Sequence, residues 1–111
     1  MVTSKPKVYS ERVIKHFALD RWFDDIFGPS LEERQYTKAK LIETALASHT
    51  LAAEHTVMVG DRREDINAGK SNGTLTIGVT YGSGSHEEIA SSTPDYICHS
   101  PYDIQRILIT Y

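Results

Sequence analysis

"MVGDRREDINAG", residues 58–69, joins the end of an apolar run to a helical pattern. Gly60 and Asp61 close the run, and Asp65 follows four residues after Asp61. A strand without polar alternation is typical of a parallel sheet that helices cover on both faces. Ligands of such sheets bind beyond the carboxyl ends of the strands. The stretch therefore predicts a buried strand that places two carboxylates at the ligand-binding edge of an α/β fold.

Outward from this stretch, short apolar runs rich in β-branched residues alternate with helical patterns. Strands are expected at 56–59, 74–80 and in DYICH, with shorter ones at 1–2 and 25–27. Helices are expected in SKPKVYSERVIKHFALD, TKAKLIETALAS, REDINAGKSNG, SHEEIASS and SPYDIQRILIT. Strands and helices that alternate at these lengths form right-handed βαβ units around a parallel sheet. We therefore expect an α/β fold of the three-layer, α/β/α Rossmann-like type, in one domain, residues 1–111.

Residues that favour helix ends support these boundaries. Thr37 and Ser85 precede helical patterns and are good N-caps, because their hydroxyls can accept an N–H of the first turn. The pair Asn72-Gly73 is typical of a helix C-terminus. The first helical pattern has an apolar face with the spacing of a single helix side, formed by Tyr9, Val13 and Phe17.

The composition narrows the range of partners. The 111 residues carry a net charge of -3, and no basic patch indicates a nucleic acid or an anionic membrane as partner. No apolar run reaches the roughly 18 residues of a membrane-spanning helix. Cys98 is the only cysteine, which excludes a disulfide within the chain and a cysteine-rich zinc site. With no secretory pattern at Met1, we expect a cytoplasmic protein.

Several residues with the chemistry of a phosphate and metal site lie near the expected strand ends. Thr3 follows the first strand and Asp61 follows the strand at 56–59, so both open on the same edge of a parallel sheet. Lys38 begins a helix in a loop that could lean over that edge. Carboxylates suit a hard cation such as Mg²⁺, whereas a lysine and a hydroxyl suit phosphoryl oxygens. The N–H groups of residues 3–5, at a helix N-terminus, would add to the anion site.

Four motifs in this order resemble the C-terminal part of a haloacid dehalogenase-like hydrolase of the phosphoglycolate phosphatase-like branch. "MVTSKP" resembles the second motif of that family, a strand that ends in Thr or Ser. "TKAKLI" resembles the third motif, and "VMVGDRRED" resembles the fourth, Gly-Asp with a second Asp four residues on. "LTIGVTYGSGSHEEI", followed by "PDYICHSPYDI", resembles the strand–loop–strand tail of the branch. The resemblance spans nearly the whole chain.

The resemblance implies a magnesium-dependent phosphatase that hydrolyses a small phosphate monoester through an aspartyl-phosphate. Thr3, with the backbone of Ser4, would bind the transferring phosphoryl group of a small phosphorylated metabolite. Lys38 would neutralise charge on that group and on the nucleophile. Asp61 would bind Mg²⁺, and Asp65 would either support the metal site or orient Lys38. Phosphoryl transfer depends chiefly on such positioning and charge stabilisation.

The first motif of the family, an Asp-x-Asp that supplies the nucleophile, does not occur in this sequence. Asp24 and Asp25 are adjacent, and they lie at the wrong point of the expected fold. The resemblance therefore implies a nucleophile and a cap domain outside these residues, on roughly a hundred further residues. We expect a fragment, or a shortened gene model, of a phosphatase that is inactive alone. Its sheet would be completed by a missing N-terminal segment or by a strand from a partner, for example in a homo-oligomer. The alternative is a short protein that binds phosphate without catalysis, or serves as a regulatory subunit.

Each candidate residue also has a plain structural interpretation. Asp61 could be the N-cap of the following helix, a common place for Asp. Asp65 could be a first-turn acid that complements the helix dipole. Lys38 could be a surface lysine; its spacing from the following Leu-Ile pair favours it over Lys40 as the third-motif lysine. Thr3 could simply end a strand.

Overall fold

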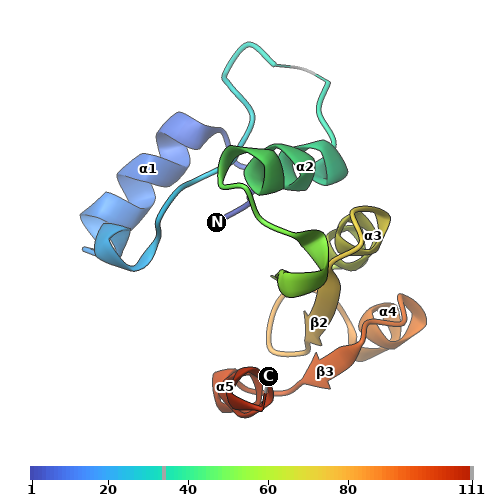
Figure 1. Ribbon diagram of the computed structural model, residues 1–111. Coiled ribbons are helices and arrows are strands. Elements are labelled where there is room, and N and C mark those ends of the chain that lie inside the picture. The colour runs from blue at the N-terminus through green and yellow to red at the C-terminus, as the bar shows by residue number, and fades with distance from the viewer. Residues whose placement is uncertain (34, 111) are drawn as a thin grey trace. The chain divides into compact units, whose positions relative to one another are not determined.

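The computed structural model describes residues 1–33 and 35–110, and the chain divides into two compact units, Met1–Leu51 and Ala52–Tyr111 (Figure 1). In chain order the α-helices (α), 3₁₀ turns (η) and strands (β) are α1 (Lys7–His16), η1 (Asp20–Trp22), α2 (Lys38–Ser48), η2 (Ala53–His55), β1 (Val57–Gly60), α3 (Arg63–Ser71), β2 (Leu75–Val79), α4 (His86–Ser91), β3 (Tyr96–Cys98) and α5 (Pro101–Ile109). Within the described ranges, no helix is both long enough and apolar enough to cross a membrane.

The first unit contains α1, η1 and α2 and a minimal parallel pairing. Val2 and Phe27 form an isolated parallel bridge. The Thr3 N–H donates to the Phe27 carbonyl at 2.9 Å, and the Phe27 N–H donates to the Met1 carbonyl at 2.8 Å. The short strands expected at 1–2 and 25–27 are therefore adjacent and parallel, but they pair at one position only.

In the first unit the N-cap of α2 follows the sequence prediction, whereas the packing of α1 does not. Thr37 caps α2 as predicted, because its hydroxyl accepts the Lys40 N–H at 3.1 Å. In α1 the buried residues are Ser10 and Ile14. The apolar face expected for this helix is largely exposed, by 44%, 42% and 65% at Tyr9, Val13 and Phe17.

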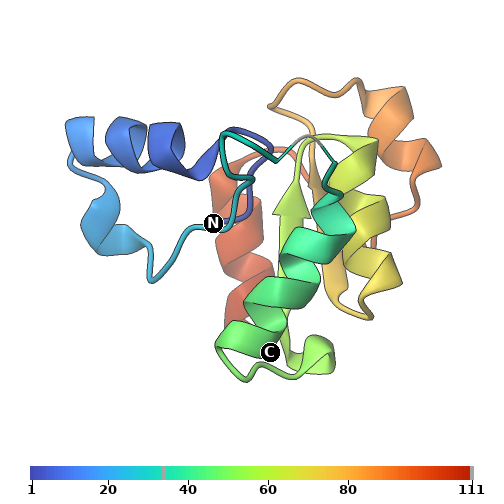
Figure 2. The same cartoon turned by 90° about the horizontal axis from the view of Figure 1, so that it is seen from above.

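The second unit is a parallel three-stranded sheet in the order β1-β2-β3. Val57 pairs with Leu75, and Ile77 pairs with Tyr96. In Figures 1 and 2, α3 and α4 lie over one face of this sheet and α5 lies over the other. The α/β class and the layered parallel sheet predicted from the sequence are confirmed.

Apolar residues fill both sides of this sheet. On the α5 side, Ile77, Val79 and Cys98 form a buried cluster, against which Ile104 and Ile107 of α5 pack. On the other side, the most buried residues of α3 and α4 are Ile66 and Ile89, each with 0% exposure. A fully buried Ile contributes about 1.5–3 kcal/mol relative to an exposed one, so these side chains account for much of the stability of the unit.

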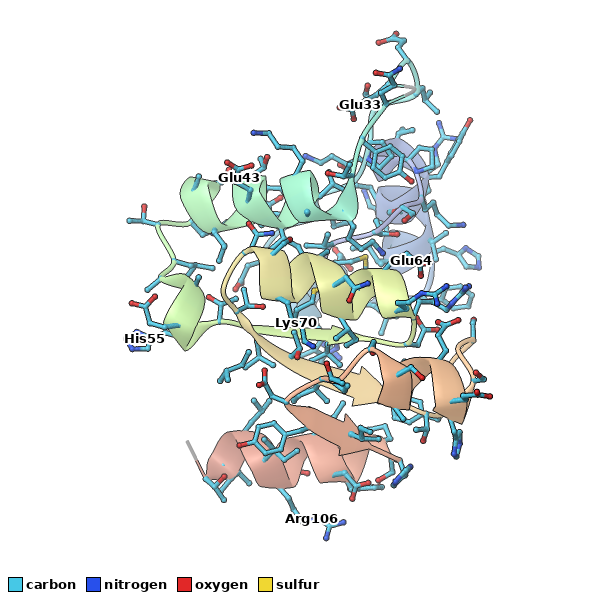
Figure 3. All side chains as sticks on the ribbon, turned by 90° about the vertical axis from the view of Figure 1, so that its right-hand side faces the viewer. Glu33, Glu43, His55, Glu64, Lys70 and Arg106 are labelled. Carbon is cyan, nitrogen blue, oxygen red and sulfur yellow. The ribbon has the colours of Figure 1, made fainter. Side chains whose placement is uncertain are left out.

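The connections in the second unit follow the helix-end signals. The helix α3 ends at Ser71, and Gly73 has a positive φ of +78°, as the Asn72-Gly73 pair predicts. Lys70, labelled in Figure 3, lies in the last turn of α3, and its Nζ donates to the Ser92 carbonyl at 2.7 Å and to the Thr93 hydroxyl. This contact joins the end of α3 to the residues that follow α4.

Candidate functional site

Asp61 lies directly after β1, at the carboxyl end of the sheet of the second unit. Its side chain accepts the Ser83 N–H on Oδ2 at 2.7 Å, and its carbonyl accepts the Gly84 N–H at 2.9 Å. Ser83 and Gly84 belong to the loop between β2 and α4. The loop that follows the neighbouring strand therefore orients Asp61 at the edge where ligands of parallel sheets bind.

The environment of Asp61 favours the charged carboxylate. The backbone N–H of Ser83 is the largest influence, and it lowers the pKa of Asp61 below its usual value of 3.8. Partial burial acts in the opposite direction, and the guanidinium of Arg62 adds a smaller lowering effect. Hydrogen bonds to the charged form favour ionisation, so Asp61 is an anion at neutral pH.

Asp65 supports the same turn from the other side. It is only 5% exposed, and its Oδ2 accepts the N–H groups of Asp61 and Arg62, each at 3.2 Å. A Cβ at Gly60 would lie 2.1 Å from the Cβ of Asp65, so only glycine allows this approach. Asp65 thus lies in the first turn of α3 and fixes the backbone that carries Asp61.

The plain interpretation of Asp61 as a helix N-cap is wrong. The N-cap of α3 is Arg62, and its side chain makes no capping hydrogen bond. Asp65 does satisfy N–H groups at the start of α3, as the first-turn interpretation predicts. The carboxylate of Asp61 therefore points to the β2–α4 loop and serves no helix cap.

The donor set at this turn suits a small hard cation. In residues 1–33 and 35–110, no group of three or more His, Cys, Asp or Glu side chains could hold a metal ion. Mg²⁺ does not require such a group, because it usually keeps several waters and takes one or two protein carboxylates. An ionised Asp61 with its backbone fixed by Asp65 fits this mode of binding.

The first unit holds the candidate phosphate-binding residues. The Thr3 hydroxyl accepts the Lys5 N–H at 3.1 Å, while the Thr3 N–H donates to Phe27. Of the three amides expected to bind an anion, those of Thr3 and Lys5 are therefore already bonded inside the protein. The Ser4 N–H donates to no other residue in the described part of the chain, and its carbonyl accepts the Tyr36 hydroxyl at 3.2 Å.

Lys38 is the first residue of α2, directly after the Thr37 cap, and is half-buried. Lys40 has a side chain that is 69% exposed and pairs with Glu43 at 3.0 Å on the helix surface; Glu43 is labelled in Figure 3. A solvated pair of this kind is an ordinary surface feature. The choice of Lys38 over Lys40 as the phosphate ligand stays a prediction from the sequence spacing.

The sequence-predicted residues fall into two groups. Thr3 and Ser4 lie in one turn of the first unit, and the hydrogen bond from Tyr36 joins that turn to the segment that leads into α2. Asp61 and Asp65 lie in one turn of the second unit. Within each group, hydrogen bonds connect the residues to their own turn. The convergence of the two groups on one ligand stays a prediction, and so do the individual roles.

Sequence reasoning missed the residues that hold Asp61 in place. These are the amides of Ser83 and Gly84. It also missed the carboxylate of Glu88, whose Oε2 accepts the N–H of Arg63, two residues after Asp61, at 2.9 Å. The spacing of Ser85 and Glu88 is that of a capping box and could have indicated an ordered turn. Ser85 does cap α4, but Glu88 contacts α3, which a local pattern could not show.

Known proteins match this chain over most of its length. Residues 37–104 match the model of the Hydrolase_like family, whose members are HAD-hydrolase-like. The 5'-nucleotidase of Pseudomonas aeruginosa is 39% identical over 108 residues, which are 97% of this chain and 49% of that protein. The phosphoglycolate phosphatase of Vibrio cholerae is 32% identical over 87% of this chain and 43% of that protein.

Solved structures of phosphatases share the fold of this chain. A predicted phosphatase from Clostridium acetobutylicum superposes with a TM-score of 0.92 at 36% identity, over 99% of this chain and 52% of its own. The chain thus spans about half the length of the relatives that it matches. With the family match over residues 37–104 and these relatives, the chain belongs to the haloacid dehalogenase-like hydrolases.

Proposed function

We propose that this chain is the metal- and phosphate-binding part of a magnesium-dependent phosphatase that hydrolyses small phosphate monoesters. The observation that carries the proposal is the turn around Asp61. An ionised carboxylate follows the end of β1, one of its oxygens accepts the Ser83 amide at 2.7 Å, and Asp65 fixes the backbone behind it. Membership of a hydrolase family supports the same activity.

Asp61 is the proposed ligand of the cation. Bound there, Mg²⁺ would supply positive charge to the phosphoryl oxygens. The Ser83 amide keeps the carboxylate oriented before any cation arrives, so little reorganisation is needed on binding. Asp65 is proposed to act behind Asp61, because its Oδ2 already accepts two backbone N–H groups. Its two expected roles, supporting the metal site and orienting Lys38, both stay proposals.

Thr3, Ser4 and Lys38 are the proposed phosphate ligands. The Thr3 hydroxyl accepts one hydrogen bond from Lys5 and still has its own proton to donate to a phosphoryl oxygen. The Ser4 N–H is the amide of this turn that remains for an anion. Lys38 would add the positive charge that a transferring phosphoryl group requires.

The covalent step needs a nucleophile that this sequence does not show. In the family the nucleophile is the first Asp of an Asp-x-Asp motif, and no such motif occurs among the 111 residues. We propose that an aspartyl-phosphate forms on a residue outside them and that this chain alone is inactive or nearly so. Two relatives are named 5'-nucleotidase and phosphoglycolate phosphatase, and both names refer to phosphate monoesters, which supports that substrate class.

The test begins with the coding DNA upstream of Met1, read in frame. An open frame that encodes a strand and Asp-x-Asp would be expressed in full and assayed with phosphoglycolate and nucleoside 5'-monophosphates. Phosphate release should depend on Mg²⁺ and should fall by at least about a hundredfold in Asp61→Asn and in Lys38→Ala. A matched control is Lys40→Ala, which removes the exposed neighbour and should leave the rate unchanged.

Two outcomes would contradict the proposal. Wild-type activity in Asp61→Asn would show that Asp61 does not serve the reaction. A stop codon directly before Met1 would mean that the cell makes the short chain, and the enzyme proposal would then fall. Binding of inorganic phosphate or of a partner, without catalysis, would become the function to test on the short chain.

A further inference from the structure

Glu88 lies where the first turns of two helices meet. It belongs to the first turn of α4, and its Oε2 accepts the Arg63 N–H at 2.9 Å and the Arg62 Nε at 2.9 Å. Its side chain is 18% exposed, so the carboxylate is largely enclosed by its partners. A carboxylate at the N-terminus of α3 also complements the dipole of that helix. Glu88 therefore joins α4 to the residues immediately after Asp61.

The loop before α4 is packed tightly between Glu88 and Asp61. A Cβ placed on Gly84 would lie 2.1 Å from the Asp61 carbonyl oxygen and 3.0 Å from the Glu88 Oε2, so only glycine fits. The Ser85 hydroxyl accepts the Glu88 N–H at 3.0 Å and fixes the start of α4. The amides that orient Asp61 thus come from a loop that is held between the turn after β1 and Glu88.

We propose that Glu88 is a positioning residue for Asp61. By bonding Arg62 and Arg63, Glu88 keeps α4 and its preceding loop against the turn after β1, and so keeps the Ser83 amide on Oδ2 of Asp61. This inference rests on the proposed role of Asp61 as the cation ligand. It adds to that role a residue that does not touch the ion.

The physical argument is one of orientation. Residues that hydrogen-bond a metal ligand from behind restrict its rotation, and their loss usually costs about 10- to 100-fold in metal affinity. Glu64 cannot replace Glu88, since it lies 4.0 Å from the Arg62 Nε and its side chain is 60% exposed. Without Glu88 the first turn of α4 loses its hydrogen bonds to Arg62 and Arg63, and the loop that carries the Ser83 amide is held less firmly against Asp61.

The test uses Mn²⁺ as the probe, because its paramagnetism reports binding without any need for activity, and it is made on the protein expressed from the full open frame. Glu88→Ala should weaken Mn²⁺ binding by about tenfold. Glu88→Gln keeps an oxygen that can accept both N–H groups, and it should recover most of the affinity. The matched control is Glu87→Ala, which removes the same charge from the same helical turn at an exposed position and should bind as the wild type.

A second readout separates positioning from general damage. Amide hydrogen exchange should show that Glu88→Ala speeds exchange at Ser83 and Gly84, whereas the Ile77 amide in β2 stays protected. If the Ile77 amide of Glu88→Ala also loses protection, that variant is generally destabilised and Glu88→Gln is used in its place. Wild-type Mn²⁺ affinity and a protected Ser83 amide in Glu88→Gln support the inference. Loss of Mn²⁺ affinity while the Ser83 amide stays protected overturns it.

The failures are distinguishable. If the wild-type chain binds no Mn²⁺, or if Asp61→Asn binds as well as the wild type, the metal role of Asp61 fails and the positioning role fails with it. If Asp61→Asn loses Mn²⁺ and Glu88→Ala does not, only the role of Glu88 is overturned. An equal loss in Glu87→Ala and Glu88→Ala would mean that net charge, and not position, sets the affinity.

Discussion

At Asp61, hydrogen bonds from different segments of the second unit meet on one residue. Its N–H donates to Asp65 in α3, its carbonyl accepts from Gly84, and its Oδ2 accepts from Ser83. Each partner lies at a different sequence distance, so the orientation of the carboxylate is a property of the assembled unit. Of these partners, only Asp65 could be predicted from the sequence, because a spacing of four residues corresponds to about one helical turn.

Removing the Asp65 side chain should destabilise the protein more than removing its exposed neighbours. Its removal in Asp65→Ala leaves the N–H groups of Asp61 and Arg62 without their acceptor in a largely buried turn. We expect a loss of about 1–3 kcal/mol in the free energy of unfolding, measured by urea denaturation followed by circular dichroism. Asp65→Asn keeps an acceptor oxygen and should lose less.

The control for this experiment is Asn67→Ala, an exposed position in the same helix. It should change the free energy of unfolding by no more than about 0.5 kcal/mol. An Asp65→Ala protein as stable as this control would show that the two amides find other acceptors. The structural role assigned to Asp65 would then be wrong, and any effect of Asp65 on activity would have to come from direct contact with the ligands.

At the scale of helices and strands, local signals predicted most of what formed. The helix caps Thr37 and Ser85 act as expected, and the three strands of the second unit lie within about a residue of the predicted bounds, the usual uncertainty of element ends. The failure is α1. The spacing of Tyr9, Val13 and Phe17 shows that they share a face, but periodicity does not say which face packs.

The buried residues of α1 are Ser10 and Ile14, and the apolar spacing of the helix does not single out either of them. Ile14 packs into the unit together with Ser10, whose hydroxyl donates to the Lys5 carbonyl at 3.4 Å and so satisfies a polar group in a buried position. Local sequence patterns also could not reveal the roles of Glu88 and Ser83, because their hydrogen-bond partners lie more than twenty residues away. A single sequence shows which residues can bond, but long-range partners appear only when the strands are in register.

The first unit contains a contact that predicts a pH dependence. His49, the C-cap of α2, bonds Asp25 through Nε2 and Oδ2 at 3.0 Å. The hydrogen bond from His49 and the Ile26 N–H lower the pKa of Asp25 below its usual 3.8. Because the folded pKa lies below the unfolded one, this group stabilises the fold above pH 3.8, and its contribution is lost as the pH falls through the folded pKa.

Asp25→Asn should therefore destabilise the first unit at neutral pH and show a smaller difference from the wild type in acid. The measurement is the urea midpoint from the fluorescence of Trp22, the only tryptophan, from about pH 6 to about pH 3. Asp24→Asn removes an adjacent acid of the same charge and is the control. A difference between Asp25→Asn and the wild type that does not shrink toward acid pH would contradict the assignment.

At the scale of the whole molecule, the sheet of the second unit has an edge at β1. In the described residues β1 pairs with β2 alone, and Val59 at its middle is 40% exposed. Parallel strands usually lie in the interior of larger sheets, and an unpaired edge presents N–H and C=O groups to another chain. The relatives are about twice as long as this chain, so they contain further residues that could pair with such an edge strand.

We therefore expect the isolated 111-residue chain to associate or to melt with low stability. Light scattering should give a mass above the 12.5 kDa of a monomer that rises with concentration. Val59→Lys puts a charge on the edge strand, which opposes strand pairing, and should shift the sample toward monomer. Ile109→Lys, at a 73% exposed position of α5, adds the same charge elsewhere and should not shift the sample toward monomer.

A 12.5 kDa monomer that melts cooperatively near about 45–65 °C would show that β1 needs no further strand, because mesophilic domains with complete cores melt in that range.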